Sequence, residues 1–452
     1  MGNLLPDALR VMKVVRYALV PKRLRLGGLC LCLCLGMLWT GAAAAAGITQ
    51  YDKFITADYW TANSPQGEQL VLDAAGVQAL NKKIMASSRS VVDLAAYPQN
   101  ISGDSVKSKL MDYQVLEDDL YRLGLAVSDN YKNILRAETN AGAVPAKVKA
   151  RYALTVRKAN LRHLPTGEGL FYSPEDTDFD VLQETVLYPM QPVVVLHASA
   201  RGNFYYVQSE NYCGWLSKLD MAFTDRSVWL RYVRPEKFLV VTAREMFIKT
   251  GAEQVRYQQG ARLPYTELKG GAYRISAPVR QTTGSAGWEP VLVAKNNPAV
   301  HDGYLPYTGN NILRSAFKWH GAPYGWGGMK NSVDCSSLLY NAYRTVGVIL
   351  PRNADEQEEA AGTLHDFDGL SAAGRLAKVK ALRPGTPLFM EGHVVLYTGT
   401  SNDTPYVLHS LGSYYSGGSR QRVMQVVTSD LTLGRADGKS FLEDITRAVE
   451  YK

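Results

Sequence analysis

A cysteine and two histidines are the residues of this chain whose types and spacing could do covalent chemistry. Cys335 lies in the tetrapeptide DCSS at residues 334–337, and His393 and His409 follow on two later β-rich runs. A thiol needs a base to become a thiolate, and the base needs a third group that fixes its tautomer. The chain offers candidates for all three roles, which points to a centre built around a thiol nucleophile.

A helix is expected from Cys335 onward, with the thiol in its first turn. Apolar residues recur every four positions at Leu338, Ala342 and Val346, which predicts an amphipathic helix. Asp334 stands where the N-cap residue would lie. Because a helix start carries partial positive charge, we expect it to lower the pKa of the Cys335 thiol.

Two β-rich runs would bring the histidines to one face of a sheet. Residues 393–398 (HVVLYT) begin with His393, and residues 406–410 (YVLHS) contain His409. If the two runs pair as neighbours, both imidazoles can lie on the same side of the sheet. The helix that begins at Cys335 would then pack against that side.

Residues 312–427 resemble the NlpC-type family of cell-wall cysteine peptidases, relatives of papain that cut peptidoglycan stem peptides. The shared motifs are PYGWGG, DCSSLLYNAY, LPRNADEQ, RPGTPLF, GHVVLYTG and VLHS, in the family's order, and Ser337 stands where the family usually has glycine. The resemblance implies that Cys335 is the nucleophile, that His393 is the general base, and that His409 orients His393.

The same resemblance implies a substrate and the residues that bind it. Tyr324 would lie near the nucleophile, and Asp334 and Ser336 would hold a free amino end. The implied reaction is hydrolysis of the bond between γ-D-glutamate and the diamino acid in L-Ala-γ-D-Glu-diamino acid peptides, with no metal and no organic cofactor. The remaining histidines show no metal-ligand spacing: His163, His197, His301, His320 and His365.

Other functions remain open from the sequence. An amidase that cuts between the glycan and L-alanine, or a related acyl transferase, would use the same thiol chemistry. A protein that binds the cell wall without catalysis would use the peptidase fold as a scaffold. Cleavage of a test peptide with a free alanine amine would distinguish the endopeptidase from the amidase and the acyl transferase. Alkylation of Cys335 would distinguish an activated thiol from a buried one.

The first 46 residues predict a secretory signal peptide. Basic residues precede the apolar stretch 26–39, and the small residues 42–46 offer a cleavage site. The apolar stretch is shorter than the roughly 20 residues that a membrane-spanning helix needs. An uncleaved anchor and a start at Met12 are the alternatives. We therefore expect a secreted protein, periplasmic or cell-wall associated, that touches the membrane only through an uncleaved signal segment.

The net charge and the number of cysteines indicate which partners and which disulfide bonds to expect. Residues 1–46 hold six basic residues and one acidic residue, so their removal lowers the formal net charge from +8 to +3. We therefore expect no nucleic-acid partner. Cys213 and Cys335 are the two cysteines outside this segment, and a disulfide between them would consume the nucleophile. We expect both thiols to be free and the protein to be a monomer.

Chain length, hydrophobic patterns and the family resemblance together predict an α+β, multidomain protein. Apolar residues at helical spacing in 67–85 and 107–137 indicate a mostly helical N-terminal segment. The order N-L-R, V-V-V-L, F-Y-Y-V and G-W-L resembles a bacterial SH3-like β-barrel, and the next β-rich stretch is either a second, divergent barrel or a β-rich linker. The predicted boundaries are 1–46 for the signal peptide, 47–150 for the helical domain, 151–225 and 226–300 for the two SH3-like barrels, and 301–452 for a papain-like catalytic domain, with its helix packed on an antiparallel sheet.

Overall fold

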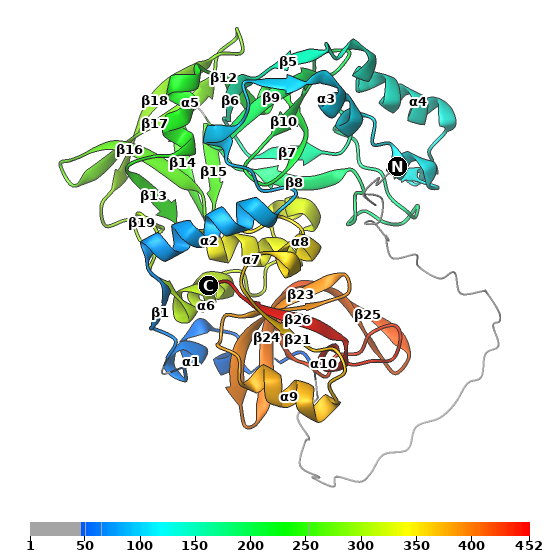
Figure 1. The fold of residues 1–452 in the computed structure, drawn as a ribbon, viewed down its shortest axis with the longest axis vertical. Helices are drawn as coiled ribbons and strands as arrows, with labels where there is room; N and C mark the ends of the chain where they lie inside the picture. The colour runs from blue at the N-terminus through cyan, green and yellow to red at the C-terminus, as the bar shows by residue number, and fades with distance from the viewer. Residues whose placement is uncertain (1–46, 50, 65, 252) are drawn as a thin grey trace, which may run out of the picture. The chain divides into compact units, whose positions relative to one another are not determined.

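The computed structural model describes residues 47–49, 51–64, 66–251 and 253–452, and the predicted signal peptide lies outside them. Figure 1 shows the arrangement of the helices and strands. Within the described ranges, no helix combines the length and the hydrophobicity that a bilayer crossing requires.

The segment before residue 151 consists of short helices and very short strands. The helices are α1 (Ala57–Ala62), α2 (Ala74–Ser87), α3 (Gly103–Leu110) and α4 (Asp129–Glu138), and the strands are β1 (Leu70–Leu72), β2 (Asn100–Ser102), β3 (Tyr121–Arg122), β4 (Leu125–Ala126) and β5 (Lys147–Lys149). Residues 107–137, where apolar residues recur at helical spacing, are α-helical only at their two ends. Between these ends, Leu123 and Gly124 take left-handed backbone angles (φ 51° and 79°) and turn β3 back onto β4.

Residues 151–223 form one antiparallel sheet of seven strands. The strands are β6 (Arg151–Thr155), β7 (Ala159–Arg162), β8 (Gln183–Leu187), β9 (Pro192–Ala198), β10 (Phe204–Gln208), β11 (Cys213–Ser217) and β12 (Met221–Phe223), in the order β12-β6-β9-β10-β11-β7-β8. The predicted strands V-V-V-L, F-Y-Y-V and G-W-L are confirmed, but the closed barrel is wrong. The two end strands β12 and β8 do not pair, because β8 packs on the turn at Gly327 and Gly328 instead.

The next β-rich region is also an open sheet and not a second closed barrel. Helix α5 (Arg226–Val233) precedes β13 (Phe238–Val241), β14 (Glu245–Thr250), β15 (Glu253–Gln258), β16 (Arg262–Lys269), β17 (Ala272–Arg280), β18 (Ala286–Ala294) and β19 (Val300–Asp302). Five strands follow the order β18-β17-β16-β13-β19, while β14 and β15 form a separate hairpin. Trp215 of the first sheet and Trp229 and Tyr257 of this region belong to one apolar cluster, so the two regions share a core.

The remaining residues build a six-stranded antiparallel sheet with helices around it. The helices are α6 (Gly309–Phe317), α7 (Cys335–Arg344), α8 (Ala354–Glu359), α9 (Ala372–Lys380) and α10 (Phe441–Asp444), and the strands are β20 (Tyr307–Thr308), β21 (Thr363–Asp366), β22 (Pro387–Met390), β23 (His393–Ser401), β24 (Thr404–Ser416), β25 (Ser419–Asp430) and β26 (Ile445–Glu450). The sheet order is β21-β26-β22-β23-β24-β25, and β20 pairs with β1 instead.

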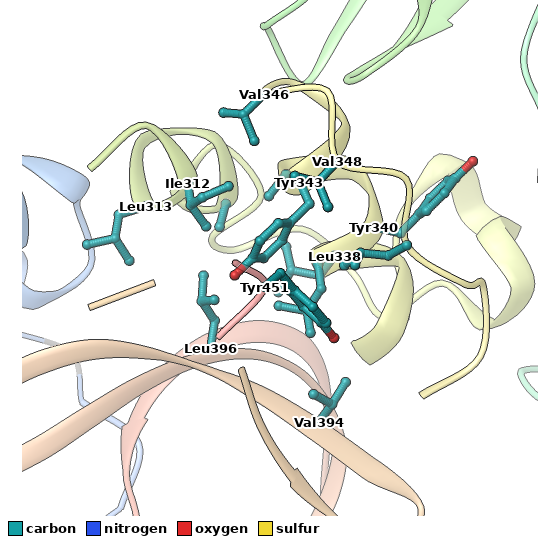
Figure 2. Packing of buried hydrophobic residues seen from close by; sticks show 14 of the residues in the cluster. Ile312, Leu313, Leu338, Tyr340, Tyr343, Val346, Val348, Val394, Leu396 and Tyr451 are labelled. Carbon is teal, nitrogen blue, oxygen red and sulfur yellow. The ribbon is translucent and has the colours of Figure 1, made fainter. Parts of the chain in front are cut away.

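Helix α7 packs on this sheet through the predicted apolar stripe. Leu338 of α7 and Val346 just beyond its end are buried in the same cluster as Val394 and Leu396 of β23, and Figure 2 shows Tyr343 and Tyr451 between Val346 and Leu396. Burial of each such side chain contributes on the order of 1.5–3 kcal/mol to folding. The expected packing of the helix on an antiparallel sheet is present, and it fixes where the first turn of α7 lies.

The first described residues extend the same sheet along β25. The backbone N–H of Gly47 donates to the Asp430 carboxylate at 2.9 Å, and the N–H of Asp430 donates to the carbonyl of Gly47 at 3.1 Å. Ile48 forms a β-bridge with Ser429. The chain that follows the predicted signal peptide is therefore held against β25, the edge strand of the six-stranded sheet.

Candidate active site

The first turn of α7 is fixed by a reciprocal pair of hydrogen bonds. The Asp334 side chain accepts from the backbone N–H of Ser337, and the Ser337 hydroxyl accepts from the backbone N–H of Asp334, both at 2.9 Å. This capping box places Cys335, which is partly exposed, at the first helical position. Ser337, where the resembled family usually has glycine, therefore has a structural role.

The environment of the thiol raises its pKa. Burial and the neighbouring Asp334 carboxylate raise the pKa of Cys335 to about 12, although the backbone N–H groups of Val394 and Ser336 act in the opposite direction. The expected lowering of this pKa by the helix start is therefore wrong, because desolvation and a nearby negative charge outweigh it. The hydrogen bond from the Val394 backbone also places the sulfur at the beginning of β23, the strand that starts with His393.

The two predicted histidines meet. β23 and β24 pair as antiparallel neighbours, and Nε2 of His393 lies 2.9 Å from Nδ1 of His409. His409 is fully buried, and its Nε2 lies 2.9 Å from the hydroxyl of Ser429 on β25. The sequence prediction named both histidines and missed Ser429, whose residue type is too common in strands to carry a signal.

The hydrogen bonds of Ser429 fix the tautomers of both rings. Its hydroxyl donates to the backbone carbonyl of Asp430 at 2.9 Å, so its oxygen accepts from Nε2–H of His409. Nδ1 of His409 then accepts from Nε2–H of His393. This assignment leaves Nδ1 of His393 unprotonated, as a general base requires.

Both histidines are neutral at neutral pH. Burial lowers the pKa of His409 to about 3. Burial, then His409 and then Arg435, lower the pKa of His393 well below its usual value. With the pKa of Cys335 raised and the pKa of both histidines lowered, the resting thiol and both imidazoles are neutral.

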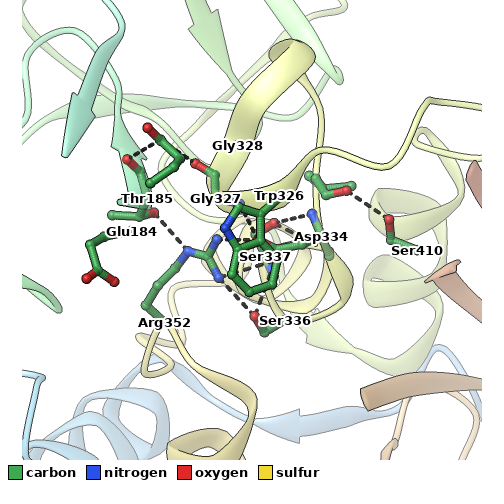
Figure 3. A network of polar contacts seen from close by, with 12 residues as sticks. Glu184, Thr185, Trp326, Gly327, Gly328, Asp334, Ser336, Ser337, Arg352 and Ser410 are labelled. Carbon is green, nitrogen blue, oxygen red and sulfur yellow. Dashed lines mark hydrogen bonds and ion pairs between the residues drawn. The ribbon is translucent and has the colours of Figure 1, made fainter. Parts of the chain in front are cut away.

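Arg352 neutralises the carboxylate of Asp334, the residue before Cys335 (Figure 3). Its Nη2 lies 2.5 Å from one Asp334 oxygen, and its Nη1 lies 3.2 Å from the other and 2.9 Å from the Ser336 hydroxyl. Burial would raise the pKa of Asp334, but the guanidinium outweighs it and the pKa is lowered. The predicted binding of a free amino end by Asp334 and Ser336 stays a prediction, and the sequence analysis left Arg352, in the motif LPRNADEQ, without a role.

Residues from the connection between β7 and β8 lie against the predicted substrate tyrosine. The ring of Phe179 lies 5.7 Å from the rings of both Tyr324 and Trp326, and the Trp326 indole donates to the carbonyl of Asp180 at 3.0 Å. Tyr324 is itself mostly buried. The first sheet region therefore contributes aromatic and backbone groups to this side of the site.

Two ion pairs connect the same segment to the turn before α7 and to strand β25. Asp178 pairs with Lys330, in the turn before α7, and with Arg422 on β25. The Asp178 side chain is buried, whereas the Lys330 and Arg422 side chains are about half exposed. The two ion pairs connect Asp178 to the turn and to β25.

The remaining candidate groups are the cysteine thiols and possible metal ligands. Cys213 and Cys335 are both free thiols, and Cys213 accepts a hydrogen bond from the Tyr206 hydroxyl at 3.2 Å. In the part of the chain that the structure describes, no three His, Cys, Asp or Glu side chains are grouped as metal ligands.

Two segments of the chain match models of known families. Residues 321–426 match the NlpC/P60 family, and residues 169–217 match an SH3 domain of the SH3b1 type. The first match includes Cys335, His393 and His409, and the second includes strands β8 to β11.

Curated proteins resemble parts of the chain. Dipeptidyl-peptidase 6 of Lysinibacillus sphaericus is 25% identical over 247 residues, which cover 53% of this chain and 84% of that protein. The bifunctional muramidase/DL-endopeptidase CwlT of Bacillus subtilis is 31% identical over 111 residues, 23% of this chain and 32% of that protein. A probable endopeptidase of Corynebacterium glutamicum is 34% identical over 116 residues, 25% of this chain and 54% of that protein. The chain thus spans about a third and about half of the last two relatives.

A solved structure shares the fold along most of the chain. It is described as an NlpC/P60 endopeptidase from Photobacterium damselae subsp. piscicida, and it superposes with a TM-score of 0.69 at 20% identity. The superposition covers 85% of this chain and 94% of that one. This likeness shows a common fold.

Proposed function

Because the chain contains an NlpC/P60 domain and an SH3 domain, we propose that it is a cysteine endopeptidase that hydrolyses the γ-D-glutamyl–diamino acid bond of peptidoglycan stem peptides. The observation that carries this proposal is the buried hydrogen-bonded chain from His393 through His409 to Ser429, beside the helix that begins at Cys335. The names of the relatives, a DL-endopeptidase and a dipeptidyl-peptidase, support the same class of reaction.

The proposed reaction begins with proton transfer from the thiol to His393. As Nδ1 of His393 takes the proton, the sulfur attacks the carbonyl carbon of the γ-D-glutamyl bond and forms a tetrahedral intermediate. His393 then gives the proton to the leaving amine, and a thioester remains on Cys335. A water molecule, deprotonated by His393, hydrolyses the thioester and restores the free thiol.

Donors for the developing oxyanion lie at the start of α7. We assign this role to backbone N–H groups there, together with the Tyr324 hydroxyl. The partial positive charge of the helix start supports a negative oxygen at this point. Loss of one such donor typically lowers the rate by about 100- to 1,000-fold.

The proposed substrates are short peptides with a free N-terminal L-alanine. Asp334 and Ser336 would bind the amine, and residues 173–180 would close that end of the site. An incoming ammonium would share the Asp334 carboxylate with Arg352. We also propose that the protein is secreted and acts as a monomer in turnover or recycling of the cell wall.

The decisive experiment is mass spectrometry of L-Ala-γ-D-Glu-diaminopimelate incubated with the protein. The N-acetylated peptide and the Cys335→Ala variant serve as controls. Release of L-Ala-D-Glu from the free peptide alone would establish the bond and the amine requirement. Cleavage of both peptides would keep the peptidase and remove the amine-binding role of Asp334. No cleavage of either peptide, with an unreactive Cys335, would favour a wall-binding protein.

A further inference from the structure

Strand β8 of the first sheet touches the residues that hold the nucleophile. The Thr185 hydroxyl accepts from Nε–H of Arg352 at 2.8 Å, and the Gln183 side-chain amide donates to the carbonyl of Gly327 at 2.9 Å. Figure 3 shows the hydrogen bond between Thr185 and Arg352. Both bonds are buried, and the Thr185–Arg352 bond joins residues 167 positions apart.

Arg352 and Gly327, the two residues in these contacts with β8, both bind the side chain of Asp334, the residue before Cys335. Arg352 holds both oxygens of the Asp334 carboxylate, and the backbone N–H of Gly327 donates to one of them at 2.9 Å. The turn is pressed closely against β8. A side-chain carbon on Gly327 would lie 2.6 Å from Cγ of Gln183.

We propose that Thr185 and Gln183 are positioning residues for Cys335, which act through Arg352 and the turn at Gly327. The SH3-type domain thereby takes part in setting the reactivity of the nucleophile. The inference rests on the proposed function in one respect, namely that Cys335 is the attacking group.

The geometry of the guanidinium gives the physical reason. Its N–H donors are fixed in one plane, and they reach Thr185, Asp334 and Ser336 at once. Without the Thr185 oxygen, a buried N–H loses its partner, and the guanidinium shifts to find another. The Asp334 carboxylate would then be less well neutralised, and its charge would disfavour the thiolate at Cys335.

The test compares Thr185→Val and Thr155→Val in the full chain. Thr155 on β6 is a matched control, because it is a buried threonine of the same sheet whose hydroxyl bonds to the carbonyl of Tyr188 and does not contact Arg352. Alkylation by iodoacetamide is followed at each cysteine by peptide mass spectrometry from neutral pH to about pH 10. Cys213 serves as the internal reference.

We expect Thr185→Val to slow alkylation of Cys335 about tenfold at each pH, with Cys213 unchanged. Thr155→Val should leave the Cys335 rate unchanged, and Thr185→Ser, which keeps the hydroxyl, should restore it. An unaltered rate in Thr185→Val, or an equal loss in both valine variants, would overturn the proposal.

A second variant decides the matter if Thr185→Val does not fold, as judged by thermal unfolding. Arg352→Lys keeps a positive charge near Asp334 but has no planar fork to reach Thr185 as well. The same tenfold loss is expected, and a wild-type rate would contradict the proposal. Alkylation needs no substrate, so failure here is distinguishable from failure of the wild-type protein to cleave stem peptides.

Discussion

The hydroxyl of Ser429 determines which nitrogen of His393 is free to act as a base. It accepts from His409 only because its own hydrogen is directed to the carbonyl of Asp430. In the absence of this hydroxyl, the His409 ring could adopt either tautomer, and in one of them it could no longer accept from His393. Ser429 is therefore the third member of the hydrogen-bonded chain that runs from His393 through His409.

Substitution of Ser429 by alanine should lower kcat about tenfold and change KM little, since the orientation of the base is lost and no substrate contact is removed. The measurement is peptide hydrolysis under steady-state conditions. Ser401→Ala on β23 is the control, because it removes a buried serine hydroxyl that bonds to Tyr59 and not to a histidine. Equal kcat values for Ser429→Ala and the wild type would argue against the tautomer assignment.

At the scale of elements, helix α7 begins where it does because two side chains satisfy two backbone N–H groups. In a variant without the Ser337 hydroxyl, the backbone N–H of Asp334 would lose its acceptor. The bond from the Ser337 backbone N–H to the Asp334 side chain would remain, so the helix start would keep one of its two capping bonds.

Ser337→Ala should lower the free energy of unfolding by about 1 kcal/mol through loss of one capping bond. Ser337→Gly should lose up to about 1 kcal/mol more, because glycine gives the unfolded chain additional freedom. Denaturant unfolding of the three proteins measures both steps. If alanine proves as stable as serine, the hydroxyl contributes nothing to the helix start.

The helices and strands also show which parts of the fold could be predicted from the sequence. The stripe of Leu338, Ala342 and Val346 and the runs at His393 and His409 are local patterns, and they predicted α7, β23 and β24 correctly. The first sheet stays open, with β8 packed against the turn at residues 327–328, and no local pattern in the sequence predicts this distant contact. Arg352 and Ser429 were missed for the same reason: their partners come from other elements.

The whole molecule contains two buried histidines that are neutral when folded. The pKa of His409 falls from its usual 6.5 to about 3, and the pKa of His393 is lowered as well. Between these values the unfolded chain binds protons that the folded chain does not. The free energy of unfolding should therefore decrease as the pH falls below about 6.5.

For His409 alone, the expected slope is about 1.4 kcal/mol per pH unit through the window between pH 6.5 and 3. Denaturant unfolding at several pH values measures it, with His409→Asn as the comparison. Asparagine does not titrate, so the variant should show a shallower dependence. The same slope in both proteins would show that His409 is charged in the folded state.

The contact at Gly47 has a consequence for how the protein is prepared. Its backbone N–H meets the Asp430 carboxylate, one residue from Ser429, at 2.9 Å. If the leader is cut after residue 46, that N–H becomes an ammonium and the hydrogen bond becomes an ion pair. A recombinant chain that retains a tag remnant ahead of Gly47 keeps an uncharged amide at this point. Comparisons of activity should therefore use protein with the processed N-terminus.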